Sequence, residues 1–177
     1  MNPRLAALGV LVLLAVSACG QGAAGQAPAA STKTVQGGAS AGATVPPAVL
    51  DPCALLGPQD RSTAGLNVLG VAKEINGARA CDWTVPATFG VTITVDERNG
   101  LKDLEVARKT ATKTEVGGRD ALKVADANAA DGTCAILLGM GEKASVQIDV
   151  SNTNFTDTPL ACERAMTVAG LAEPKLP

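Results

Sequence analysis

The pattern of apolar and polar positions divides the chain into three parts. An apolar stretch of about 12 residues, 5–16, opens the chain. Residues 20–47 consist almost entirely of Gly, Ala, Ser, Thr, Gln and Pro, with no periodic apolar pattern. From residue 48 onward, apolar positions recur at the periods of strands and helices. The pattern therefore predicts one folded domain over residues 48–177.

Alternation with a period of two predicts the strands of this domain. The clearest case is residues 90–96, in which Val91, Ile93 and Val95 alternate with polar residues. Short turns rich in Gly and Asp separate the predicted strands, so we expect consecutive strands to pair antiparallel. A nearly continuous apolar run predicts a central strand over residues 133–138, and the other predicted strands are residues 80–85, 112–116, 121–125 and 144–150.

Helical segments are predicted early in the domain and in its middle. Asp51 is suited to cap a helix and Pro52 to occupy its first position. Pro58 opens a further helical turn that runs to Ala64. The spacing of apolar residues over 101–108 predicts a short amphipathic helix.

A longer helix is predicted at the C-terminus. Asp157 or Thr158 caps it, and Pro159 takes the first helical position. Apolar residues then recur at helical spacing, so one stripe of the helix should face the core. We expect the buried stripe to consist of Cys162, Ala165, Met166 and Ala169.

The N-terminus carries the features of an export signal. Arg4 precedes the apolar stretch, which is shorter than the ~20 residues that a transmembrane helix needs. The sequence VSAC at residues 16–19 resembles the bacterial lipobox. That resemblance implies that residues 1–18 are a lipoprotein signal peptide and that Cys19 receives diacylglyceryl chains such as palmitate, which anchor the protein on the extracytoplasmic side of the cell membrane. The lipidated Cys19 and the flexible linker would then occupy residues 19–47.

Composition narrows the functional classes. The formal net charge is −2, so the chain lacks the basic surface that nucleic-acid binding requires. Histidine is absent, which excludes Ser-His-Asp and Cys-His catalysis and disfavours a zinc enzyme. We therefore expect a protein that is not an enzyme, has no cofactor and no metal, and is monomeric.

The domain contains four cysteines, Cys53, Cys81, Cys134 and Cys162, at spacings of 28, 53 and 28 residues. No pair has C-x-x-C spacing, and an exported domain with an even count favours disulfides. Four cysteines allow three pairings, of which locality favours Cys53–Cys81 and Cys134–Cys162. Trp83 should pack beside the first bridge. Together the elements predict an α+β fold: a mainly antiparallel sheet of about five or six short strands, flanked by N- and C-terminal helices, with two disulfides.

Several loop residues could carry chemistry. Asp126, Asp131, Asp149 and Asp157 lie in or near predicted loops and could supply oxygen ligands, but they match no calcium-binding loop, so solvated charges are favoured. The Gly-x-Gly and Lys of residues 139–145 lie between two predicted strands and indicate a hairpin turn, not a phosphate-binding loop.

Phe155 is the aromatic residue that stands in a polar loop. It is a candidate contact residue for a partner. The alternative, which we favour, is that its ring caps an edge of the core.

Four short motifs together resemble a family of actinobacterial cell-envelope lipoproteins of unknown function. They are DPCALL at residues 51–56, ACDW at 80–83, GGRDA at 117–121 and C-E-x-A at 162–165. The resemblance covers residues 51–177 together with the lipobox and linker. It implies a lipid-anchored extracytoplasmic domain and supplies no catalytic residues.

Three functional classes remain open. The first, which we favour, is a noncatalytic binding or accessory module of the cell envelope with a protein, wall or lipid partner. The second is a carrier or receptor for a small molecule or lipid, which would need an apolar cavity between sheet and helix. The third is a histidine-free hydrolase, which would show a carboxylate cluster with a buried, perturbed member.

Overall fold

The computed structural model describes residues 49–106, 110–126 and 128–177. They begin with two short helices, η1 (Pro52–Leu55) and α1 (Pro58–Thr63), and end with α2 (Thr158–Ala172) and η2 (Glu173–Lys175). Between them lie β1 (Val71–Ile75), β2 (Ala78–Val85), β3 (Phe89–Asp96), β4 (Ala111–Val116), β5 (Arg119–Val124), β6 (Thr133–Gly139) and β7 (Ser145–Asn152).

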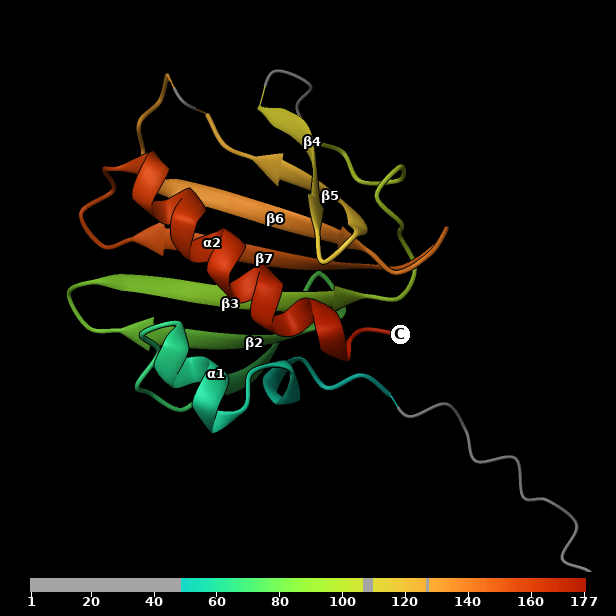
Figure 1. The fold of residues 1–177 in the computed structure, drawn as a ribbon, viewed down its shortest axis with the longest axis horizontal. Coiled ribbons are helices and arrows are strands. Elements are labelled where there is room, and N and C mark those ends of the chain that lie inside the picture. Colours follow the sequence, from blue (N-terminus) through green and yellow to red (C-terminus); the bar gives the residue numbers. More distant parts are fainter. Residues whose placement is uncertain (1–48, 107–109, 127) are drawn as a thin grey trace, which may run out of the picture. The chain divides into compact units, whose positions relative to one another are not determined.

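All seven strands form one antiparallel sheet in the order β1-β2-β3-β7-β6-β5-β4 (Figure 1). The predicted α+β class and its antiparallel sheet are confirmed. The expected count of five or six strands is wrong, because β1 was not predicted. Its sequence VAKEI is mostly exposed at the sheet edge and carries Lys73 and Glu74 side by side, so the alternation of a half-buried strand is missing.

The core lies on one face of this sheet. In β3 and β7 the residues Val91, Ile93, Val146 and Ile148 are at most 1% exposed, and the residues between them are partly exposed and mostly polar. Opposed residues of antiparallel neighbours share a face, and Ile93 is directly opposite Ile148 in the register. The central strands therefore present one apolar and one polar surface, as the alternation predicted.

Helices and disulfides brace the apolar face. Cys53 of η1 is bonded to Cys81 of β2, and Cys134 of β6 is bonded to Cys162 of α2. These are the two pairs that locality favours. Figure 1 shows α2 crossing the sheet over β6 and β7. We call this surface the helix face.

The first disulfide lies in a tightly packed corner beside Trp83, which is fully buried. A Cβ atom on Gly70 would come within 2.6 Å of the Cys81 sulfur and 2.7 Å of the Trp83 ring. Only glycine fits there, because real side chains do not tolerate such contacts. The chain entering β1 is thereby packed directly against the bridge and the ring.

Two helix predictions need correction. Residues 101–104 form turns and residues 105–106 have no regular structure, so the helix expected over 101–108 is absent from its described part, residues 101–106. This connection joins β3 to β4, which lie on either side of β7, β6 and β5. A helix rises only ~1.5 Å per residue, and an extended chain covers this width with far fewer residues.

The buried stripe of α2 is also rotated from the expected one. Ala165 and Ala169 are buried as expected, but Cys162 and Met166 are only partly buried. The full stripe is Thr158, Ala161, Ala165, Val168, Ala169 and Ala172. Small residues allow α2 to lie close to the sheet, which moves the longer Met166 to its flank. Asp157 is the N-cap, and its Oδ1 accepts from the backbone N–H of Leu160 at 3.1 Å.

Among the described residues, no helix is long and apolar enough to cross a membrane. Cys19 and the predicted signal peptide and linker lie outside the described residues.

Candidate functional site

The face of the sheet opposite α2 is polar, and we call it the open face. Its central positions are Thr92 and Thr94 of β3 and Gln147 and Asp149 of β7, all partly exposed. Both disulfides and α2 attach to the helix face, so these polar side chains remain accessible at the surface. The alternation of β3 and β7 places them in two adjacent rows.

Two clefts hollow the open face. One has a volume of about 500 Å³ and includes Asp82, Thr92, Thr133 and Asp149 in its lining. The other has a volume of about 350 Å³ and is lined by the opposite ends of β3 and β7, with Asp149 in common. The two clefts share Asp149 in their linings, and we refer to the pair of clefts as the trough.

Asp149 is the one carboxylate for which the structure indicates a raised pKa among the described residues. Burial raises the pKa, and the Gln147 amide and the charge of Lys73 oppose that shift without cancelling it. Gln147 Nε2 donates to both carboxylate oxygens, each at 2.9 Å. The carboxyl group is therefore held in place on the trough floor, and its negative charge is poorly solvated.

Asp82 lies two strands away in the same row, because Thr92 is opposite both Asp82 and Asp149. Its Oδ1 accepts from Thr92 Oγ1 at 2.7 Å and from Lys73 Nζ at 2.9 Å. Burial raises the pKa of Asp82, but the hydrogen bonds from Thr92 and Lys73 outweigh burial and lower it overall. The Asp82 carboxylate is thus ionised and held by the hydrogen bonds from Thr92 and Lys73.

Two loop carboxylates close the larger cleft at one end. Asp126 Oδ1 accepts from the backbone N–H of Asn128 at 2.9 Å, and Asp131 Oδ1 accepts from Thr133 Oγ1 at 2.8 Å. The hydrogen bonds from Thr133 lower the pKa of Asp131. Both groups line the same cleft as Asp149.

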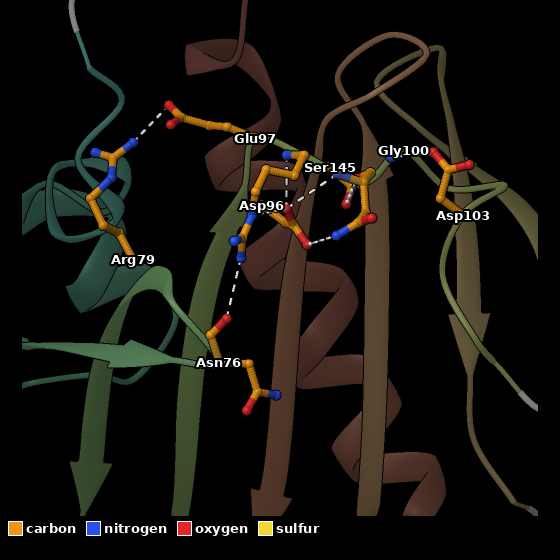
Figure 2. Close-up of polar contacts among 9 residues, drawn as sticks. Asn76, Arg79, Asp96, Glu97, Gly100, Asp103 and Ser145 are labelled. Carbon is orange, nitrogen blue, oxygen red and sulfur yellow. Dashed lines mark hydrogen bonds and ion pairs between the residues drawn. The ribbon is translucent and has the colours of Figure 1, made fainter.

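A hydrogen-bonded turn closes the other end of the trough (Figure 2). Asp96 accepts from the backbone N–H of Arg98 at 2.9 Å and from the Asn99 side chain at 2.7 Å. Ser145 Oγ donates to the Asn99 carbonyl at 2.8 Å, and Arg98 donates to the Asn76 carbonyl at 3.2 Å. Burial raises the pKa of Asp96, but these amide donors and Arg98 lower it overall. This end is preorganised by its own polar contacts.

A groove of about 660 Å³ lies between α2 and the strands β4 and β5, and it shares Thr110, Ala125 and Asp126 with the larger cleft. Pro159, Met166 and Ala125 give it apolar walls, and Lys123 and Glu163 are charged residues of its lining. Its size suits a small ligand. Its lining includes several polar and charged residues, so it differs from the apolar cavity expected for a carrier.

The other candidates from the sequence have structural roles or stand alone. Asp157 caps α2, and residues 139–145 join β6 to β7 as the expected hairpin. Phe155 is 69% exposed, so the favoured expectation that its ring caps the core is wrong. No group of His, Cys, Asp or Glu able to hold a metal ion occurs in the part of the chain that the structure describes.

The trough itself was missed by sequence reasoning. Asp149 was assigned to a loop-like, solvated setting, but it lies within β7 and is partly buried. Asp82 and Thr92 were read only as polar positions of their strands. The alternation places Thr92 and Asp149 on polar faces, but the pairing of β3 with β7, far apart in sequence, brings them together. No local signal specifies that pairing.

The fold and the site define a class: a disulfide-braced α+β domain with one helix-covered sheet face and one polar, hollowed face. The family model described as "Protein of unknown function (DUF3558)" matches residues 14–175. The chain belongs to this family. No match was found among the curated proteins or among the solved structures.

Proposed function

We propose that the protein is a lipid-anchored, extracytoplasmic and monomeric lipoprotein that acts as a noncatalytic binding module of the cell envelope. The observation that carries this proposal is the trough on the open face. It is a concave surface of fixed polar side chains, which is the form that recognition sites take. The partner is an envelope component and not a nucleic acid, since the chain has a net charge of −2.

The anchoring part of the proposal rests on the lipobox-like residues 16–19. Two or more acyl chains on Cys19 would hold the protein at the membrane stably, which a single chain does not. Replacing Cys19 by Ala should move the protein from the membrane fraction to the soluble extracytoplasmic fraction and abolish palmitate labelling. Persistence of the variant in the membrane fraction would contradict lipidation at Cys19.

The noncatalytic part rests on how the carboxylates are engaged. Asp149, whose pKa burial raises, belongs to a cluster of carboxylates, and a cluster with a buried, perturbed member is the feature that we associated with a hydrolase. Hydrogen bonds hold both groups in place: Asp82 accepts from Lys73, Thr92 and Thr84, and both oxygens of Asp149 accept from Gln147. These bonds favour a fixed recognition surface.

Site-specific cross-linking tests the binding role. A photoreactive amino acid at Thr94 points into the trough, and the same amino acid at the exposed Thr167 of α2 is the matched control. In intact envelopes, we expect a discrete adduct from Thr94 and none from Thr167. The proposal is wrong if Thr94 yields no adduct or if both positions yield the same one.

A carrier function is the second candidate, and the groove beside α2 favours it. Met166 is partly buried and lines this groove, so Met166→Trp should fill it. A carrier would copurify with a stoichiometric lipid or small molecule, detectable by mass spectrometry, and Met166→Trp would lose it. Purification of the protein without such a ligand would exclude this candidate.

A further inference from the structure

We propose that the trough binds an extended peptide segment that carries lysine side chains. The inference rests on the proposed binding function and names its ligand class. Three properties of the open face carry it: the charge of the trough, its length along β3 and β7, and the absence of aromatic side chains from its lining.

Charge is the first property. Five carboxylates line the trough: Asp82, Asp96, Asp126, Asp131 and Asp149. Two cations accompany them, and each already lies against a carboxylate: Lys73 against Asp82 at 2.9 Å, and Arg98 against Asp96 at 4.0 Å. Within the described residues, no ion pair joins Asp126, Asp131 or Asp149 to a basic side chain. Arg108 and Lys109 lie outside that part of the chain, so this balance does not include them.

Among the described residues, the excess negative charge is concentrated around the larger cleft, where Asp149 is poorly solvated. An ammonium group placed there would add to the charge of Lys73, which offsets the burial of Asp149 only in part, and a cation within ~4–6 Å stabilises an ionised carboxylate. Interfaces of this kind gain specificity and association rate from complementary charge. The electrostatics of the cleft therefore favour a cationic ligand over a neutral or anionic one.

The length of the trough is the second property. It extends along β3 from Gly90 to Asp96, a run of about 20 Å at ~3.3 Å per residue. An extended hexapeptide has the same length. Its alternate side chains project to one side ~7 Å apart, so different lysines can reach Asp82 and Asp149 beside Thr92 and Asp96 at the end of β3.

The absence of aromatic residues is the third property, and it distinguishes a peptide from a glycan. The chain has three aromatic residues, and all of them are described. Trp83 and Phe89 are buried in the core, and neither they nor Phe155 line the trough. A sugar ring would find no flat apolar platform there. Carboxylates and hydroxyls instead match the ammonium groups and backbone N–H groups of a peptide.

Calorimetric titration of the full chain, held in nanodiscs of zwitterionic lipid, tests the inference. The probe is a hexapeptide of alternating serine and lysine, capped at both ends, and its control replaces each lysine by glutamine. We expect saturable binding of the lysine peptide that weakens as salt is raised, because the attraction is between charges. The glutamine peptide should bind at least about tenfold more weakly.

Matched variants locate the site. Asp131→Asn combined with Asp149→Asn should weaken binding of the lysine peptide about tenfold, and Glu163→Gln, in the groove beside α2, should leave it unchanged. Equal binding of both peptides, or unchanged affinity in the double variant, overturns the lysine assignment. If the two peptides bind equally and Thr94 still gives a cross-linked adduct, the lysine assignment is wrong but the trough remains a binding site for another ligand class. If neither peptide binds and Thr94 gives no adduct, the proposed function is wrong as well.

Discussion

The two faces of the sheet are built from the same strands but serve different ends. Ile93 and Ile148 on the helix face are fully buried, whereas Thr92 and Asp149, one residue away, line an open trough. Both disulfides and α2 belong to the helix face. Stability is thus concentrated on one face, which leaves the polar residues of the other face available for recognition.

This comparison also explains how a domain with three aromatic residues remains folded. A core made of Val, Ile, Leu and Ala contributes about 25 cal/mol per Å² of buried apolar area. Two covalent bridges reduce the conformational freedom of the unfolded chain as well. The polar face is then not needed for the core, and it can keep a carboxylate such as Asp149 that burial disfavours.

The largest expected effect contrasts two neighbouring residues of β3. Ile93→Ala opens a cavity in the core and should lower the free energy of unfolding by about 2–5 kcal/mol. Thr94→Ala on the open face should change it by no more than ~0.5 kcal/mol. Urea denaturation followed by the fluorescence of Trp83 measures both. Similar losses for the two variants would mean that the faces do not differ as described.

The next effect concerns the disulfides. Each bridge closes a loop of 28 residues, so the chain-entropy model predicts that each one stabilises the folded state by about 3–4 kcal/mol. We expect Cys134→Ala with Cys162→Ala, and Cys53→Ala with Cys81→Ala, to lower the free energy of unfolding by similar amounts. A much larger loss for the second pair would reveal an additional contribution from its packing against Trp83 and Gly70.

The smallest effect is on the open face and depends on pH. The pKa of Asp149 is raised in the folded protein, so the folded state holds this proton more tightly than the unfolded state. Stability should therefore fall as pH rises from the ordinary carboxyl pKa through the raised one, and the penalty should persist at neutral pH. Asp149→Asn removes this penalty, because an amide side chain has no charge to desolvate.

Thermal unfolding across the acidic range checks this prediction. At neutral pH the Asp149→Asn variant should melt at a higher temperature than the parent, and the difference should vanish at low pH. Gln147→Ala is the comparison variant, since it removes the amide that holds the carboxylate. A lower melting temperature for Asp149→Asn at neutral pH would show that the charge is stabilising.

Much of the fold could be predicted from local patterns. Alternation located β2, β3 and β7, a nearly continuous apolar run located β6, and the Asp-Pro and Asp-Thr-Pro sequences located the helix starts. Proximity in sequence gave both disulfide pairs, because each joins a terminal helix to a strand 28 residues away. These features depend on contacts within short stretches or on covalent constraints.

The trough could not be predicted, because it depends on long-range pairing. Asp82, Thr92 and Asp149 form one row only because β3 pairs with β2 on one side and with β7 on the other. β1 was missed for a related reason: an exposed edge strand has no buried face to impose an apolar period. Residues 101–106 showed a helical period, but the need to reach the far edge of the sheet overrides it.

Methyl and side-chain amide NMR during titration with the lysine peptide tests the central claim, that the open face binds a ligand, most directly. Backbone signals of β3 and β7 do not distinguish the two faces of the sheet, whereas each side-chain signal reports on one face only. We predict saturable shifts of the Thr92 and Thr94 methyl signals and the Gln147 amide, with the Ile93 and Met166 methyl signals unchanged. Shifts confined to Met166, with the threonine signals unmoved, would contradict the account.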